Sequence, residues 1–272
     1  MKNRNFIIDK PFTYQKEFLK SYKDIFDIDI DKSIKIIKET KQFYDGKLDY
    51  GYAKDLQLQW YNSLYKNHID YSVYDDFYYF TDLWCCWQMY SRSYILSILK
   101  NNLFKDCKVI VDLGCGLGLT TSLLKQIFPN SRVIGTNLKN TKQYKYCEYL
   151  SKLYDFELVE EKDLPNNVDL IFASEYFEHI EDATDNIKKL IKLTNAKHFY
   201  LANSFNTLSV GHFHKYKYFV GWKVFDDGKI PIYSLYDEKE VSRKFNQVLK
   251  DSGYKKIKTN NWNNKPALWS LS

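Results

Sequence analysis

The sequence contains no C-x-x-C pair, and its five cysteines are an odd number scattered along the chain. Cys85 and Cys86 are adjacent, so they point to different sides of any helix, while Cys115 stands between two glycines as a small packing residue. A disulfide framework is therefore not indicated. We predict reduced thiols in a cytoplasmic protein.

Long apolar runs are also missing. Residues 1–12 hold no stretch suited to a secretory signal. Residues 77–99 are long and aromatic, but Asp82, Gln88 and Arg92 interrupt them. That pattern indicates a buried or interfacial helix rather than a membrane span. We therefore expect no membrane association.

Internal repeats and low-complexity linkers are lacking as well, which favours a main domain, residues 101–272, with an appendage packed against it. The appendage, residues 1–100, has few glycines and many tyrosines. Helical patterns occur in it at 13–26, 32–44, 53–66 and 75–100. Such an extension either covers a ligand crevice as a lid or only buries aromatic side chains, and both interpretations stay open.

The most informative stretch that is present covers residues 108–128. Residues 108–113 predict a buried parallel strand, and residues 119–128 predict a helix. Between them, Gly114, Gly116 and Gly118 remove the side chains that would keep a ligand away from the backbone. The first N–H groups of the helix would face that ligand.

Strand and helix patterns alternate after this turn. Further strands are expected at 131–138, 156–161, 168–174 and 197–204, and a last pair at 254–259 and 266–271 follows a helix at 238–252. Alternation of this kind predicts an α/β fold with a doubly wound parallel sheet. Its ligand crevice lies outside the carboxyl ends of the strands.

The glycine spacing separates two cofactor classes. A dinucleotide site would need its third glycine one residue later, where Leu119 stands. From residue 108 onward the chain resembles the class I S-adenosylmethionine-dependent methyltransferases, whose first motif is an acidic residue followed by Leu-Gly-x-Gly-x-Gly. The resemblance implies a Rossmann-like, mostly parallel seven-stranded sheet with an antiparallel carboxyl-terminal hairpin, and S-adenosylmethionine as cofactor.

The resemblance also implies the cofactor-binding residues. Asp163, in the segment 162–165, would accept a hydrogen bond from the adenine amino group, and the fourth strand would pass beneath the methionine portion. The implied set is Asp112, Gly114, Cys115, Gly116, Gly118, Asn137, Leu138, Lys162, Asp163, Leu164, Ser174 and Glu175. Asn137 departs from the family, which usually has Asp or Glu there to hold the ribose. An amide loses charge assistance, so cofactor binding would be weaker, or the ribose contact would come from elsewhere. A non-catalytic cofactor-binding or assembly subunit therefore stays an alternative.

Glu175, Glu178 and His179 follow the fourth strand at spacings of three and four, which would place them on one face of a helix. Their E-x-x-E-H segment resembles that of small-molecule O-methyltransferases and of RNA 3′-terminal 2′-O-methyltransferases. In the RNA enzymes these residues and a later histidine hold a divalent ion. Here His212 or His214 would be that histidine, because alternate residues of an extended segment face opposite ways. The predicted ligand set is Glu175, Glu178, His179 and His214, with Mg²⁺ or Mn²⁺ as the ion.

The sequence is compatible with two kinds of chemistry at these residues. His179 would equally serve as a general base without a metal. The prediction for the acceptor is an oxygen, or less readily a nitrogen, of a small polar metabolite or sugar. The alternative is a metal-assisted enzyme acting on RNA, DNA or a nucleotide, because the net charge is +6 and aromatic residues lie among the lysines. Base methylation is disfavoured because residues 174–177 lack the paired prolines that amino-methyltransferases of DNA carry. The oligomeric state stays open.

Overall fold

The computed structural model describes residues 50–66, 68–76, 79, 102–205, 209–213, 219–225, 228–233, 238–259 and 266–271. The helices expected at 13–26 and 32–44, and most of the one expected at 75–100, lie outside these residues. The division of the chain at residue 100 therefore stays a prediction.

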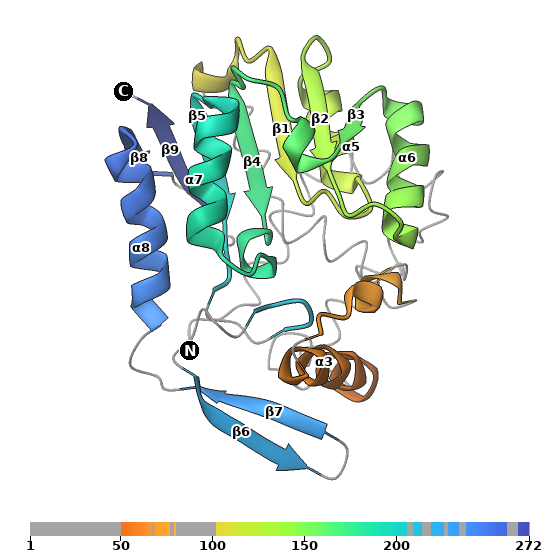
Figure 1. Ribbon diagram of the computed structural model, residues 1–272. Helices are drawn as coiled ribbons and strands as arrows, with labels where there is room; N and C mark the ends of the chain where they lie inside the picture. The colour runs from red at the N-terminus through yellow and green to blue at the C-terminus, as the bar shows by residue number, and fades with distance from the viewer. Residues whose placement is uncertain are drawn as a thin grey trace, which may run out of the picture.

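The alternating segments form the predicted doubly wound sheet, with the order β3-β2-β1-β4-β5-β9-β8 (Figure 1). The strands are β1 (Val109–Leu113), β2 (Arg132–Thr136), β3 (Glu157–Val159), β4 (Leu170–Ser174), β5 (His198–Ala202), β8 (Tyr254–Ile257) and β9 (Ala267–Leu271). β1 to β5 pair in parallel, whereas β9 pairs antiparallel with both β5 and β8. The expected Rossmann-like α/β fold with an antiparallel pair near the carboxyl end is confirmed.

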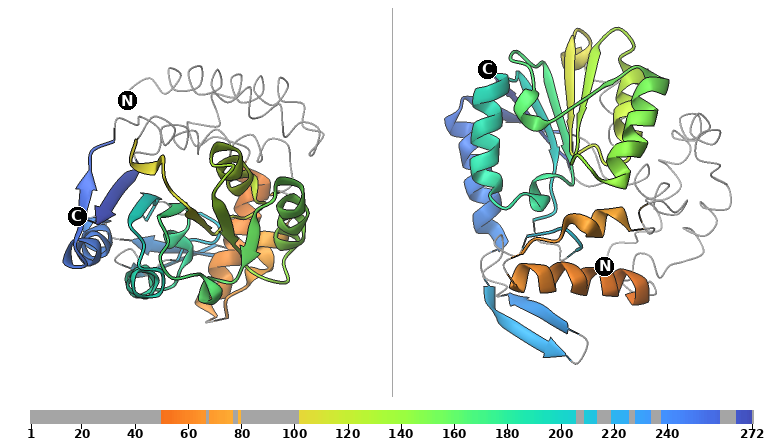
Figure 2. Two further views of the ribbon diagram at one scale, coloured as in Figure 1. Left: turned by 90° about the horizontal axis from the view of Figure 1, so that it is seen from above. Right: turned by 45° about the vertical axis from the view of Figure 1, so that its right-hand side comes forward.

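Helices cover both faces of the sheet. They are α5 (Leu119–Ile127), α6 (Lys142–Tyr154), α7 (Ala183–Thr194) and α8 (Glu238–Asp251). Right-handed crossovers run outward from β1 in one direction and from β4 in the other, so their helices must lie on opposite faces. Figure 2 shows α5 and α6 on one side of the sheet and α7 and α8 on the other. The strand order reverses between β1 and β4, and that point is where such sheets bind ligands.

Four strands, β2, β3, β5 and β8, end two residues earlier than the sequence predicts. At two of them the residues that follow the strand take up other contacts. β2 ends at Thr136, and the side chain of Asn137 then bonds to the backbone of the glycine turn. β3 ends at Val159, and a short 3-10 helix, η6 (Glu161–Asp163), begins directly after Glu160.

Part of the amino-terminal region lies at the carboxyl ends of the strands. Helix α3 (Tyr50–Tyr65) and the 3-10 helix η2 (Tyr71–Asp75) are found there (Figure 1). Trp60 and Tyr61 are fully buried and belong to the same hydrophobic core as the sheet residues. Across the described parts of the chain, no helix has the length and apolar character needed to cross a bilayer.

A second, two-stranded sheet was not predicted. Strands β6 (Phe219–Phe225) and β7 (Gly228–Tyr233) pair antiparallel after β5, and β7 contacts α3. Figure 1 shows this hairpin beyond α3, on the side toward which β1 and β4 point. The sequence Asp226-Asp227-Gly228, which joins the two strands, consists of turn-forming residue types and was the local signal available.

Candidate active site

The glycine turn after β1 has the backbone that its sequence predicts. Gly114, Gly116 and Gly118 all have positive φ angles, of 62°, 55° and 84°. At Gly116 an added Cβ would lie 3.2 Å from Oε1 of Gln143, the first side chain across the turn. L residues rarely adopt this backbone, so the turn requires glycine for conformation as well as for space.

Residues at the end of β2 hold the turn in place. The backbone N–H groups of Gly114 and Cys115 donate to Oγ1 and to the carbonyl of Thr136, at 3.0 and 2.8 Å. Nδ2 of Asn137 donates to the Gly116 carbonyl at 2.6 Å, while Oδ1 of Asn137 accepts from the N–H of Leu138. The Asp or Glu that the resembling family usually has at this position could not make the bond to the Gly116 carbonyl, because a carboxylate has no proton to donate.

Two buried cysteine side chains pack against each other at the glycine turn. Sγ of Cys115 lies 3.5 Å from Sγ of Cys147, and both residues are fully buried. The hydrogen bond with Cys147 and burial raise the pKa of Cys115 well above its usual range. Cys115 is therefore a neutral packing residue, as its sequence position indicates.

The other residues that the resemblance assigns to the cofactor fall into two groups. Asp112, Leu164 and Ser174 are buried, and Oδ2 of Asp112 accepts a 2.6 Å hydrogen bond from Oγ1 of Thr121. Leu138, Lys162 and Asp163 are exposed at the tips of β2 and β3. The exposed carboxylate of Asp163 is open to a ligand, whereas Leu164 is part of the hydrophobic core.

The E-x-x-E-H segment differs from its predicted form. β4 ends at Ser174, and Glu175 has a left-handed φ of 53°, so it lies outside the short 3-10 helix η7 (Phe177–His179). The expectation that the two glutamates and His179 share one helical face is therefore wrong. The N–H of Glu175 donates to the Ala202 carbonyl, which anchors this residue to the end of β5.

Both glutamates are bound to Ser204, which follows β5. Oε1 of Glu175 accepts from Oγ of Ser204 at 3.0 Å, and Oε1 of Glu178 accepts from the N–H of Ser204 at 2.8 Å. Glu178 is completely buried, and its Oε2 has no hydrogen-bond partner within the described part of the chain. Burial and the neighbouring Glu175 carboxylate raise the pKa of Glu178 well above its usual range. The two carboxyl groups therefore favour a state in which they carry one proton between them.

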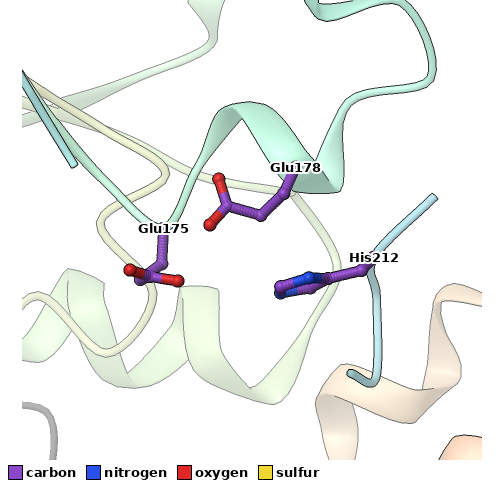
Figure 3. Close-up of side chains that lie close together, drawn as sticks. All are labelled: Glu175, Glu178 and His212. Atoms are coloured by element: carbon purple, nitrogen blue, oxygen red, sulfur yellow. The ribbon is translucent and has the colours of Figure 1, made fainter. Parts of the chain in front are cut away.

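The third member of this cluster is His212. One ligand-type atom each from Glu175, Glu178 and His212 lies within 4.8 Å of the others (Figure 3). The loop that carries His212 is fixed to η7, because the N–H of Phe213 donates to the Glu178 carbonyl at 3.0 Å. We call these three residues the Glu–Glu–His cluster.

The remaining histidines are placed differently. Nδ1 of His179 is hydrogen-bonded to the Tyr74 hydroxyl at 2.9 Å, so His179 faces η2 and is not a member of the cluster. His214 lies outside the described residues. Ser204 is a site residue that sequence reasoning missed, because it was placed at the end of the strand predicted at 197–204, whereas β5 ends at Ala202. Tyr74 and Trp60 also contact this region, and no local pattern distinguishes them from other aromatic residues of the extension.

Comparison with known proteins agrees with this architecture. Residues 111–196, from β1 to the end of α7, match the family described as "Methyltransferase domain". No curated protein matches the sequence at a significant level.

Several solved structures are similar to the chain in part. An O-methyltransferase family protein from Burkholderia thailandensis is 11% identical with a TM-score of 0.45, over 71% of this chain and 60% of that one. CalS10, an amino pentose methyltransferase from Micromonospora echinaspora, is 10% identical with a TM-score of 0.45, over 68% of this chain and 92% of that one. EvdMO1 is 12% identical with a TM-score of 0.40, over 67% of this chain and only 40% of its own length.

The glycine turn after β1 and the sheet order with its antiparallel β9 accompany the family match. Residues 111–196 are thus similar to the methyltransferase domain family and lie within a Rossmann-like α/β fold.

Proposed function

We propose that this methyltransferase transfers the methyl group to a hydroxyl oxygen of a small polar metabolite or sugar. The observation that carries the proposal is the Glu–Glu–His cluster, which stands at the carboxyl end of β4 beside the glycine turn after β1. Proton-accepting groups beside a methyl donor suit an acceptor that must lose a proton. The three positive-φ glycines leave room for a cofactor to approach the backbone.

S-adenosylmethionine, when bound, supplies a methyl group carried on a positively charged sulfur. The chain's own part is to hold both partners in line and to exclude water. The residues proposed to hold the cofactor are Asp112, Gly114, Cys115, Gly116, Gly118, Asn137, Leu138, Lys162, Asp163, Leu164, Ser174 and Glu175. Of the two glutamates, Glu175 is the one partly open to solvent, so an acceptor hydroxyl reaches its carboxylate first.

Glu178 leaves Glu175 as the proton acceptor of the pair. Burial and the nearby Glu175 carboxylate raise the pKa of Glu178, so Glu178 holds the proton that the two carboxyl groups share. Glu175 is then the ionised carboxylate that can act as general base. The proton of the acceptor hydroxyl therefore passes to Glu175, and His212 lies beside both carboxyl groups.

Labelled S-adenosylmethionine tests this function without knowledge of the acceptor. We expect calorimetry to show cofactor binding by the purified protein. With an extract of cells that make the protein, label should enter the small-molecule fraction and not the RNA fraction. Absence of cofactor binding would refute the proposal, and mass spectrometry of the labelled product would identify the acceptor.

A metal-assisted reaction on an RNA, DNA or nucleotide hydroxyl is the second candidate. Glu175, Glu178 and His212 offer oxygen and nitrogen donors of the kind that Mg²⁺ or Mn²⁺ accepts, and Oε2 of Glu178 has no partner within the described chain. Such an ion would lower the pKa of a bound hydroxyl. Transfer of label to RNA that stops on exhaustive chelation and returns with Mn²⁺ would favour this candidate. Transfer to small molecules that survives chelation would exclude it.

Asn137 gives a separate test of the cofactor site. Asn137→Asp loses the bond to the Gly116 carbonyl, so the free protein should have a lower Tm. The same change offers a charged acceptor to the ribose hydroxyls, and we expect affinity for S-adenosylmethionine to rise by about tenfold. Thermal melts and calorimetry measure the two effects. An unchanged or lowered affinity would contradict the assignment of the ribose to this position.

A further inference from the structure

The hydroxyl of Tyr74 connects the amino-terminal region to the E-x-x-E-H segment. Tyr74 lies in η2 and packs against the hydrophobic core, and its hydroxyl is hydrogen-bonded to Nδ1 of His179 at 2.9 Å. Burial, then the nearby Tyr79, Tyr71 and Glu178, raise the pKa of Tyr74 well above its usual range, so the phenol stays neutral. A neutral phenol bonded to one ring nitrogen constrains the orientation of an imidazole, whichever of the two groups donates.

Gly211 shows how closely this contact is packed. Its φ is 81°, and an added Cβ would lie 2.1 Å from the Tyr74 hydroxyl oxygen and 2.5 Å from Nδ1 of His179. Three segments far apart in the sequence, η2, η7 and the loop after β5, therefore meet at one point. Any side chain at residue 211 would separate Tyr74 from His179.

His212 follows Gly211, and its backbone is held by a residue of α3. Nε1 of the fully buried Trp60 donates to the His212 carbonyl at 2.9 Å. The rings of His179 and His212 then meet edge to face, with centroids 4.7 Å apart and an interplanar angle of 85°. The orientation of the His179 ring consequently limits where the His212 ring can lie beside the two glutamates.

The η2 segment also contacts residues beside the glycine turn after β1, where the cofactor is proposed to bind. Nε2 of Gln143 donates to the Tyr74 carbonyl at 2.8 Å, and Oδ1 of Asp75 accepts from the N–H of Lys142 at 2.5 Å. Gln143 is also the side chain nearest to Gly116. η2 thus lies between the glycine turn and the histidine pair, in contact with residues on both sides.

We propose that Tyr74 and Trp60 are positioning residues for the methyl-acceptor side of the site, acting through His179 and His212. The α3–η2 segment then completes the Glu–Glu–His cluster and is more than a packing layer. This inference rests on the proposed function, because it assigns His212 a place beside the reacting hydroxyl.

Tyr74→Phe removes the hydroxyl and nothing else, so it is the central variant. We expect the rate of label transfer from S-adenosylmethionine to the small-molecule fraction to fall by about tenfold, the usual effect of losing one buried hydrogen bond. Cofactor affinity should stay at the wild-type value. At one fixed pH, the nitrogen chemical shifts of the His179 ring should move, since its Nδ1 loses the hydrogen bond to the Tyr74 hydroxyl. Tyr71→Phe is the matched control, because Tyr71 stacks on Tyr74 and is exposed, and it should change neither quantity.

Trp60→Phe serves as a second variant, because it keeps an aromatic ring and removes the N–H that binds the His212 carbonyl. It should lower transfer while leaving cofactor affinity unchanged. Wild-type transfer in Tyr74→Phe, or reduced transfer with unmoved His179 signals, would overturn the inference. If the wild-type protein labels no small molecule, the proposed function fails, while the His179 spectra still decide whether Tyr74 orients that ring.

Discussion

Gly116→Val should remove detectable binding of S-adenosylmethionine, with a loss of affinity of at least about a hundredfold. The backbone of Gly116 has a φ of 55°, which a β-branched residue adopts only under strain. Its side chain would also project into the space above the turn that the cofactor needs. In the free protein the added Cβ meets only the flexible end of Gln143, at 3.2 Å, so the chain should still fold. Calorimetry with S-adenosylmethionine measures the effect.

Gly253→Val is the matched control for backbone strain. Gly253 has a φ of 89° and follows α8, and an added Cβ there makes only an ordinary 3.5 Å contact with Leu271. This variant should lose a similar amount of stability and bind the cofactor normally. Wild-type affinity in Gly116→Val would refute the cofactor site, and equal losses in both variants would show that strain alone is responsible.

Glu178→Gln should bind S-adenosylmethionine with unchanged affinity and transfer its methyl group about a hundredfold more slowly, as expected for a weakened general base. The amide keeps Oε1 as acceptor for the Ser204 N–H, so the fold is preserved. An amide at residue 178 cannot share a proton with Glu175, so only one carboxyl group of the pair is left to handle the proton of the acceptor hydroxyl. Label transfer to the small-molecule fraction is the measurement.

Glu181→Gln is the control for this change, because Glu181 is exposed and lies just beyond η7. It should have wild-type activity. Full activity in Glu178→Gln would show that the buried carboxyl has no part in catalysis. A loss of cofactor affinity in that variant would instead move Glu178 from the acceptor side to the cofactor side.

The order and type of the elements after residue 108 are predictable because each is set by local pattern. Apolar runs of four or five residues bounded by glycine or by polar turns specify the strands, and the glycine turn specifies the connection after β1. The hairpin β6–β7 was missed, although the turn-forming residue types at 226–228 are a local signal. The predicted end of β2 was too late, because the side chain of Asn137 donates a hydrogen bond to the glycine turn after β1. The pattern of apolar and polar residues along a strand does not indicate such a contact.

The site was predictable in its residue types and only partly in its geometry. Glu175 and Glu178 lie together as expected, but the left-handed φ of Glu175 removes it from the helix and leaves His179 facing Tyr74. Spacing rules assume one continuous element, so they cannot anticipate a backbone reversal between two site residues. His212 is the histidine beside the two glutamates, and its backbone is held by contacts between residues far apart in the chain. One of them is the hydrogen bond from Trp60, which is 152 residues away. No local stretch of sequence contains both residues.

The position of β9 between β5 and β8 has a consequence for how the protein is made. The parallel half of the sheet can assemble as soon as β5 has left the ribosome, but β8 has no neighbour until residues 267–271 follow it. During that interval the edges of both β5 and β8 present unpaired N–H and C=O groups to other nascent chains. Pairing of residues 267–271 with β5 and β8 therefore covers both edges and ends the period in which the nascent chain is prone to aggregate.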